Sequence, residues 1–202
     1  MSGQPITDRQ PLIMTWRRVL DNASFEICHL IPTGLGYRLR GTILAVEQGQ
    51  PVECQYQVVC DLDWRTREVR LHQYSGLVES SLDLVVDGNS WIQSGHGPLP
   101  RLAGCADVDI ELTPATNALP VNRLNLGIGQ SVEIQAAWVR LPSLAIVPAR
   151  QRYARLSENV YRYTSVDSGF TAEIEVGQYG LPNRYGKIWE VVPVVVPKVA
   201  RD

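Results

Sequence analysis

The sequence has no long hydrophobic run and no strong excess of charge of either sign. Nowhere do about 18 apolar residues follow one another, so we expect no integral membrane segment. Residues 1–11 lack the charged start and apolar stretch of a signal peptide, which predicts a cytoplasmic location. The 19 basic and 21 acidic residues are mixed along the chain and leave a net charge of −2. Such a balance offers no basic surface for nucleic acid, which is therefore not an expected partner.

Catalytic and metal-binding motifs are also missing. The chain has no G-x-S-x-G, Walker or H-E-x-x-H motif and no dinucleotide fingerprint, and its three histidines are isolated. On these grounds we predict no catalytic residues, no metal ion and no cofactor. The cysteines form no C-x-x-C pair and lie in apolar, strand-like segments, where a buried reduced thiol is the usual state. These cysteines are Cys28, Cys54, Cys60 and Cys105.

The chain does contain many short runs in which apolar and polar residues alternate, separated by turn residues. About a dozen runs, with turn signals roughly every 8 to 12 residues, predict an all-β fold. We expect one domain over residues 1–202, with 1–12 loosely ordered. It would be a large, strongly curved antiparallel sheet that forms a barrel or half-barrel with few short helices. The expected strands cover residues 14–20, 24–30, 37–46, 52–61, 64–74, 82–86, 90–93, 105–112, 131–141, 144–147, 151–156, 160–164, 170–176 and 188–196.

Two parts of this pattern need separate comment. Residues 151–164 are predicted as a hairpin around a Ser-Glu-Asn turn, but a helix over 149–161 is a competing interpretation. Residues 94–104 contain three glycines and two prolines, which predict a loop without regular structure.

The most informative segment begins as a strand with one acidic face. Asp107, Asp109 and Glu111 alternate with apolar residues, and side chains on a strand point alternately to its two faces. Same-face neighbours lie roughly 7 Å apart, so these carboxylates repel unless water, cations or donors lie nearby. One interpretation is that these carboxylates bind sugar hydroxyls or a Ca²⁺ or Mg²⁺ ion. The alternative is that they form a solvated strand face without a ligand. The spacing of calcium loops is absent, which disfavours the metal.

Two prolines bracket the segment that follows the acidic strand. Pro114 cannot donate to a sheet ladder, so the strand is expected to end before it. We expect residues 115–123 to form a stiff polar loop between Pro114 and Pro120. Such a loop beside an acidic strand face is suited to holding a ligand.

A group of arginines offers a second kind of chemistry. Arg65, Arg67 and Arg123 carry forked guanidinium groups that suit carboxylate, phosphate or sugar-acid ligands. The equally supported alternative is a structural network in which these arginines neutralise the acidic residues. Asp61 is expected to join the acidic face from a neighbouring strand.

Aromatic and amide side chains complete the candidate site. The tryptophans would either stack against a sugar ring or line a cavity for an acyl chain, although such residues more often form the core. Gln151 and Tyr153 are expected near Asn117, where they would add directional hydrogen bonds to a headgroup. The tryptophans are Trp16, Trp64, Trp91, Trp138 and Trp189.

Several motifs are specific in residue type and order. They include Cys-Ala-Asp-Val-Asp at 105–109, Thr-Pro-Ala-Thr-Asn at 113–117, Trp-Arg-Thr-Arg at 64–67 and Trp-Val-Arg at 138–140. With them the chain, from about residue 16 to about 189, resembles a bacterial family long known as a domain of unknown function and now described as putative glycolipid-binding. The resemblance implies a fold like that of lipid-carrying lipoprotein and lipoprotein-transport domains, with a strongly curved sheet and an apolar concave face.

The residues and the resemblance together favour a binding protein for a glycolipid or another amphipathic small molecule. Its acyl part would occupy an apolar concave cavity, and its polar headgroup would lie near the acidic strand. The alternatives are a carbohydrate- or lipid-modifying hydrolase that uses Asp107 and Asp109, and a scaffold that does neither. The sequence does not indicate an oligomeric state. The predicted ligand-binding residues are Asp61, Trp64, Arg65, Asp107, Asp109, Asn117, Arg123, Gln151 and Tyr153.

Overall fold

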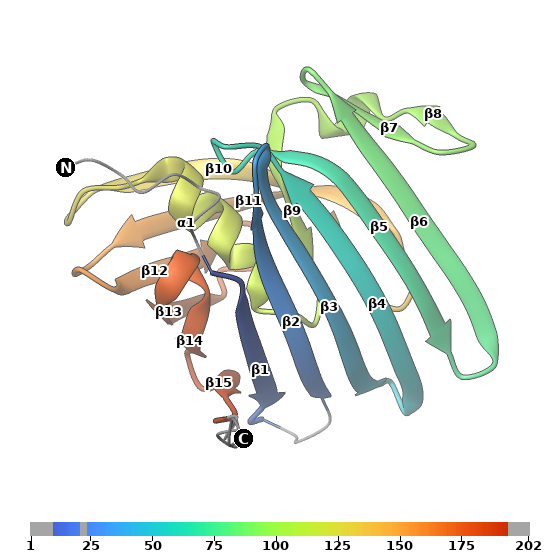
Figure 1. The fold of residues 1–202 in the computed structure, drawn as a ribbon, viewed down its shortest axis with the longest axis horizontal. Coiled ribbons are helices and arrows are strands. Elements are labelled where there is room, and N and C mark those ends of the chain that lie inside the picture. Colours follow the sequence, from blue (N-terminus) through green and yellow to red (C-terminus); the bar gives the residue numbers. More distant parts are fainter. Residues whose placement is uncertain (1–9, 21–23, 194–202) are drawn as a thin grey trace, which may run out of the picture.

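A computed structural model of the protein describes residues 10–20 and 24–193. Fifteen strands form one sheet in the order β8-β7-β6-β5-β4-β3-β2-β1-β15-β14-β13-β12-β11-β10-β9, and neighbours are antiparallel except β9 and β10. The sheet is strongly curved and stays open between its edge strands β8 and β9 (Figure 1). The predicted all-β half-barrel with few short helices is therefore confirmed.

The strands are β1 (Leu12–Arg18), β2 (Ser24–Thr33), β3 (Gly36–Glu47), β4 (Gln50–Cys60), β5 (Thr66–Ser75), β6 (Val78–Asp87), β7 (Ser90–Gln93), β8 (Gly97–Pro98), β9 (Cys105–Ile110), β10 (Ser131–Val139), β11 (Ile146–Arg155), β12 (Val160–Ser165), β13 (Thr171–Val176), β14 (Pro182–Tyr185) and β15 (Trp189–Val191). Within the described residues there is one α-helix, α1 (Ala118–Leu124), and there are 3₁₀ turns at Pro100–Leu102, Ala115–Asn117 and Gln178–Gly180.

The sheet curls so strongly that its edge strand β9 lies inside the curve (Figure 1). Strands β1 to β6 form a front wall in Figure 1, and the strands from β10 to β14 lie beside and behind it. Strand β9 lies against β5, where the backbone N–H of Val108 donates to Thr66 Oγ1 at 3.0 Å. The indole N–H of Trp91 in β7 donates to the carbonyl of Cys105 in β9 at 2.9 Å. The first hydrogen bond holds β9 on the inner face of the front wall, and the second ties β9 to β7.

Alternation along each strand separates this inner face from a polar outer face. In β4, Tyr56, Val58 and Cys60 are buried, whereas Gln55 is exposed and Gln57 is half-buried. The same alternation recurs in β2, β3 and β5 because successive side chains of a strand point to opposite faces. The hydrophobic core therefore lies on the inner face of the front wall, and polar side chains cover its outer face.

Tryptophan side chains fill much of the space inside the curve. Four of them belong to one hydrophobic cluster that extends across the inner face. The indole N–H of Trp16 donates to the carbonyl of Pro182 at 2.6 Å, which ties β1 to β14. The concave side that was expected to hold an acyl chain is thus packed with the protein's own side chains. The buried tryptophans are Trp16, Trp64, Trp91 and Trp189, and Trp138 is half-buried.

The segment after the acidic strand differs from its prediction as a stiff polar loop. Residues 115–124 form a 3₁₀ turn followed by α1, and residues 113–121 are buried. Proline is compatible with this helix because Pro120 lies in its first turn, where backbone N–H groups have no intrahelical acceptor. The helix ends at Asn125, which adopts a left-handed conformation with φ 42°. The loop prediction was wrong because it counted the prolines as breakers and not as helix starters.

Other boundaries also shifted. Residues 149–161 are not a helix, since β11 and β12 form the predicted hairpin. Residues 94–104 contain the two-residue strand β8 and a 3₁₀ turn, so this segment is not entirely irregular. Strand β14 was not predicted, and of the strand expected at 188–196, residues 194–196 lie outside the described residues. None of the helices in the described part of the chain has the length and apolar character needed to cross a membrane.

Candidate functional site

A buried ion pair joins the acidic strand β9 to helix α1. Arg123 donates from Nε to Asp107 Oδ1 at 2.8 Å and from Nη2 to Asp107 Oδ2 at 2.5 Å. The side chain of Asp107 is 1% exposed and that of Arg123 is 15% exposed. Burial raises the pKa of Asp107, and the guanidinium of Arg123 opposes that shift. The two parallel hydrogen bonds fix the helix on the strand.

A neighbouring polar layer is built around Asp109. Its Oδ2 accepts a hydrogen bond from Gln151 Nε2 at 2.6 Å, and its Oδ1 accepts one from Thr116 Oγ1 at 3.3 Å. Burial raises the pKa of Asp109 to about 6. The hydroxyl of Tyr153 donates to Asn117 Oδ1 at 2.8 Å. Hydrogen bonds among these side chains therefore connect β9, β11 and the turn before α1.

Asp61 organises the turn between β4 and β5. Its Oδ1 accepts the backbone N–H groups of Asp63 at 3.0 Å and Arg65 at 2.9 Å. Its Oδ2 accepts Nε of Arg67 at 3.0 Å and Nη2 at 2.6 Å. Trp64 lies in the same turn, with a left-handed φ of 64°.

The predicted residues therefore fall into separate groups. Arg67 pairs with Asp61 and Arg123 with Asp107, which confirms the structural-network alternative for these two pairs. Within residues 10–20 and 24–193, Asp109 has amide and hydroxyl partners and no arginine partner. Whether the buried layer of β9 also meets a ligand stays a prediction.

Three of the predicted residues do meet at the surface. Trp64, Arg65 and Arg123 line an open, polar hollow of about 420 Å³ between the β4–β5 turn and the C-terminal end of α1, here called the α1 hollow. Its full lining is Leu62, Asp63, Trp64, Arg65, Asn122, Arg123 and Asn125.

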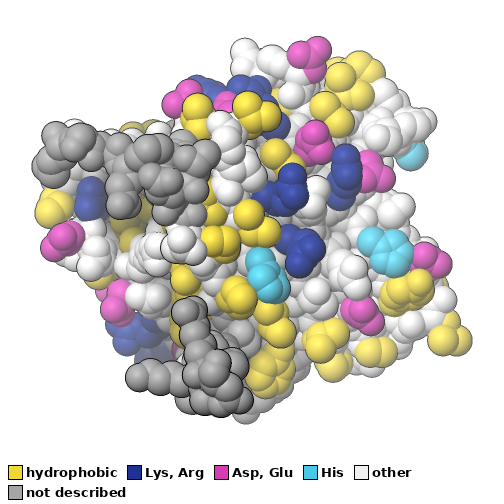
Figure 2. All heavy atoms as spheres, viewed as in Figure 1, with side chains coloured by type: hydrophobic (Ala, Val, Ile, Leu, Met, Phe, Trp, Pro, Cys, Tyr) yellow, Lys and Arg dark blue, Asp and Glu magenta, His cyan; other side chains and the backbone are white. Residues whose placement is uncertain are grey.

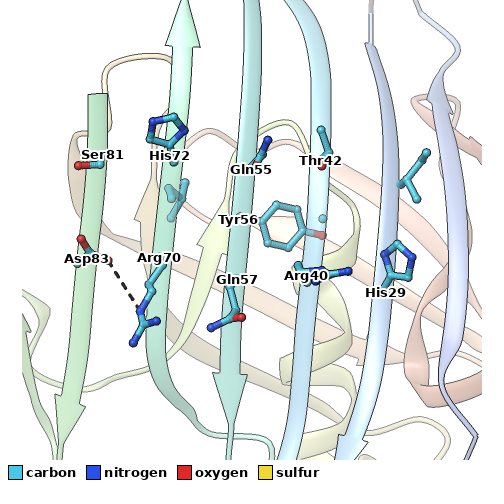
Figure 3. Close-up of a pocket in the computed structure, with 13 residues that line it drawn as sticks. His29, Arg40, Thr42, Gln55, Tyr56, Gln57, Arg70, His72, Ser81 and Asp83 are labelled. Carbon is cyan, nitrogen blue, oxygen red and sulfur yellow. Dashed lines mark ion pairs between the residues drawn. The ribbon is translucent and has the colours of Figure 1, made fainter. Parts of the chain in front are cut away.

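A larger hollow, which the sequence did not reveal, lies on the outer face of the front wall. Its polar side chains come from neighbouring strands and form a row of cross-strand partners from β2 to β6 (Figure 3). This row consists of His29, Arg40, Gln57, Arg70 and Asp83. Directly paired residues lie about 5 Å apart, so the row is continuous across the sheet. The adjacent row consists of Ile27, Thr42, Gln55, His72 and Ser81.

These two rows line an open groove of about 790 Å³, here called the sheet groove. Its size is that of a typical small-molecule site. Figure 2 shows arginine and histidine side chains gathered over this face. The ring of Tyr56, which comes from the inner face, forms part of the floor beneath Gly41 (Figure 3).

The charges in the sheet groove are only partly neutralised. Arg70 lies 3.1 Å from Glu68 and 3.9 Å from Asp83, measured between nitrogen and oxygen. Arg40 is exposed and forms no ion pair with any residue that the structure describes. The groove therefore offers a free guanidinium beside amide and hydroxyl groups.

The outer face becomes apolar at the end where β3 turns into β4. Phe25 and Leu44 are cross-strand partners and are 47% and 53% exposed. Val46, two residues further along β3, is 50% exposed. Leu44 also lines a smaller open hollow of about 310 Å³ together with Pro51 and Tyr74. Figure 2 shows hydrophobic side chains along this lower end of the strands. A polar groove and an apolar strip thus lie side by side on one sheet face.

A buried carboxyl group lies under the groove. Glu26 is 1% exposed and accepts a hydrogen bond from the hydroxyl of Tyr56 at 2.5 Å. Burial raises the pKa of Glu26 to about 7, and hydrogen bonds from Thr113 and Tyr56 oppose the shift. Sequence reasoning missed Glu26 because it stands alone among the apolar residues of β2. Among residues 10–20 and 24–193, no group of three or more His, Cys, Asp or Glu side chains is placed to hold a metal ion.

The fold is an open, all-β half-barrel with an amphipathic outer face, and comparison with known proteins gives its family. The chain belongs to the family described as "Putative glycolipid-binding", whose profile matches residues 13–191. A crystal structure of a DUF1089 family protein from Pseudomonas aeruginosa is similar, with a TM-score of 0.77 and 31% sequence identity. The match covers 83% of this chain and 91% of that chain. No curated protein matches this sequence.

Proposed function

We propose that this protein binds a glycolipid-like amphipathic ligand on the outer face of its front wall. The sugar headgroup would lie in the sheet groove, and the start of the acyl chain would lie on the strip formed by Phe25, Leu44 and Val46. The family description supports the ligand class. The observation that carries the proposal is that a polar groove passes directly into an exposed apolar strip on the same strands.

The chemistry of the groove suits a saccharide. Gln55, Gln57 and Thr42 offer amide and hydroxyl groups that both donate and accept hydrogen bonds, as sugar hydroxyls require. Arg40 adds a cationic donor for an acidic or phosphorylated sugar.

The apolar strip suits one hydrocarbon chain. Phe25, Leu44 and Val46 are about half exposed, so each loses further apolar surface when a chain covers it. Burial of apolar surface contributes about 25 cal/mol per Å², or about 0.8 kcal/mol for each methylene group. A chain that crosses this strip would therefore account for most of the affinity, and the groove for the specificity.

The hydrolase alternative receives less support. Asp107 is bound on both oxygens by Arg123, and Asp109 by Gln151 and Thr116. Neither carboxyl group lines the sheet groove or the α1 hollow. We therefore favour binding without a reaction. The buried free thiols fit a reducing compartment, and the protein would act in the cytoplasm.

Calorimetric titration with an alkyl maltoside below its critical micelle concentration tests the proposal. We expect saturable binding that is weakened about tenfold by Arg40→Gln, because a hydrogen bond to a charged group is worth roughly 1.5–3 kcal/mol. Leu44→Gln should also weaken binding of the alkyl maltoside but should leave binding of free maltose unchanged. Arg38→Gln is the matched control, because Arg38 lies on the same face of β3 and does not line the groove. Equal losses in Arg38→Gln and Arg40→Gln, or no saturable binding, would refute the site.

A further inference from the structure

The α1 hollow has features that point to a ligand of its own. It lies between the β4–β5 turn and the end of α1, and its lining is independent of the sheet groove. Two arginines and two asparagines contribute to its surface. Its volume of about 420 Å³ suits a compact polar molecule and is too small for a lipid chain with its headgroup.

Arg123 is held rigidly at the wall of this hollow. A guanidinium group has five N–H donors, and the buried carboxylate of Asp107 takes one at Nε and one at Nη2. Three N–H donors therefore have no partner among the described residues. Because Asp107 already fixes the side chain, Arg123 loses little conformational freedom when a ligand binds. The site is preorganised on this side.

Arg65 supplies a second guanidinium to the lining of the same hollow. It is exposed and forms no ion pair with the part of the chain that the structure describes. Its backbone is fixed by the hydrogen bond from its N–H to Asp61 Oδ1. Trp64, the residue before it, keeps a left-handed backbone while its ring stacks on Tyr37 at a centroid distance of 3.8 Å. Such backbone strain at a non-glycine residue persists only where the surroundings enforce it, and it is frequent at binding sites.

The opposite rim of the hollow is formed by the C-terminal end of α1. Asn125, at the C-terminal end of α1, has φ 42° and lines the hollow with Asn122. Asp63 contributes the single carboxylate among the residues that line this hollow. Two guanidinium groups and one carboxylate therefore line the hollow, which leaves an excess of positive charge.

We propose that the α1 hollow is a second binding site, which takes the phosphate group of a small polar molecule between Arg65 and Arg123. Both the fixed fork of Arg123 and the free guanidinium of Arg65 line this hollow, and a phosphate group offers oxygen acceptors to both. Asn122 and Asn125 lie where the rest of the ligand would extend. This site goes beyond the proposed glycolipid function and does not depend on it.

NMR titration of the whole protein with inorganic phosphate, and in parallel with glucose 6-phosphate, tests this site. We expect saturable shifts of the side-chain amide signals of Asn122 and Asn125 with both probes. Arg65→Gln should weaken binding about tenfold, and Asp63→Asn should strengthen it. Arg65→Gln keeps the backbone N–H that binds Asp61, so the turn should stay folded.

Arg184→Gln is the charge-matched control, because Arg184 is exposed on β14 and does not line the hollow. Its phosphate affinity should stay within twofold of that of the unmodified protein. Equal losses in Arg65→Gln and Arg184→Gln would reduce the effect to nonspecific charge attraction and overturn the proposal. Absence of saturable shifts at Asn122 and Asn125 with either probe would overturn it as well.

Discussion

Gly41 lies directly over the ring of Tyr56. A Cβ atom placed at position 41 would lie 2.4 Å from Tyr56 Cε1 and 2.6 Å from its hydroxyl oxygen, closer than any real contact of that kind. Tyr56 is thereby able to lie beneath β3, with its hydroxyl on Glu26 and its ring at the floor of the sheet groove. Because Gly41 has no side chain, Tyr56 contacts both the buried Glu26 and the floor of the proposed binding surface.

Gly41→Ala should destabilise the protein by about 2 kcal/mol, since overpacking a core contact costs roughly 1–3 kcal/mol. Gly34→Ala is the matched control, because a Cβ there meets no atom within 4 Å. Both variants reduce the freedom of the unfolded chain equally, so their difference reports the contact with Tyr56. Urea unfolding measures both free energies. Equal stability of the two variants would show that Tyr56 moves aside without cost.

Asp107→Asn should lower the free energy of unfolding by about 3 kcal/mol or more, because it leaves a partly buried guanidinium without its counter-charge. Glu133→Gln is the comparison, since Glu133 and Arg152 form an exposed ion pair with an N–O distance of 3.0 Å. Exposed pairs contribute less than about 1 kcal/mol. Chemical denaturation of both variants gives the two values. Similar small losses would mean that α1 is held on β9 by packing alone.

Stability should depend on pH through Glu26. Its pKa is about 7 in the folded protein and about 4.5 when exposed, so the unfolded chain loses this proton first as the pH rises. The contribution of Glu26 to stability is therefore complete below about pH 4.5. As the pH rises to about 7, this contribution is lost and the free energy of unfolding falls by roughly 3 kcal/mol. Glu26→Gln cannot ionise and should lack this part of the decline.

Urea unfolding of both proteins at intervals from pH 4.5 to 8 makes the comparison. Asp109, whose pKa is about 6, titrates in both proteins, so its contribution cancels from the difference between the two curves. Parallel curves for the variant and the unmodified protein would contradict the burial argument.

The thiols should be unreactive in the folded protein. All four cysteines are free and buried. Burial raises the pKa of Cys105 to about 11 and that of Cys54 to about 12, so the reactive thiolate is scarce at neutral pH. We expect negligible reaction with a thiol reagent under native conditions and four equivalents in denaturant. Rapid native labelling of any cysteine would show that its strand opens readily.

Much of the fold follows from alternation that is visible in the sequence. The strand around Val58 and the one around Ile174 were predictable because apolar residues recur at every second position. The residues around Pro120 were not, since the same proline breaks a strand and starts a helix. Nor does a single chain show that β9 would run parallel to β10, because this pairing depends on how the sheet curls.

The candidate site was predictable only in part. Pairing of Arg123 with Asp107 follows from residue type, and the structural alternative anticipated it. The sheet groove depends on strand register. Arg40 and Arg70 are 30 positions apart in sequence and fall in the same cross-strand row because both pair with Gln57 of β4, which lies between them. One signal was present: β3 is polar at Arg40 and apolar at Leu44 on the same face. That change of polarity along one face marks the amphipathic surface.

An NMR titration with an alkyl maltoside, followed through the backbone amides of β2 to β6, tests the glycolipid proposal most directly. The proposal predicts saturable shifts that concentrate at Thr42, Gln55 and Gln57, and it predicts that a longer alkyl chain extends them to Leu44 and Val46. Shifts centred instead on the buried layer of Asp109 and Asn117, or no saturable shifts below the critical micelle concentration, would contradict it.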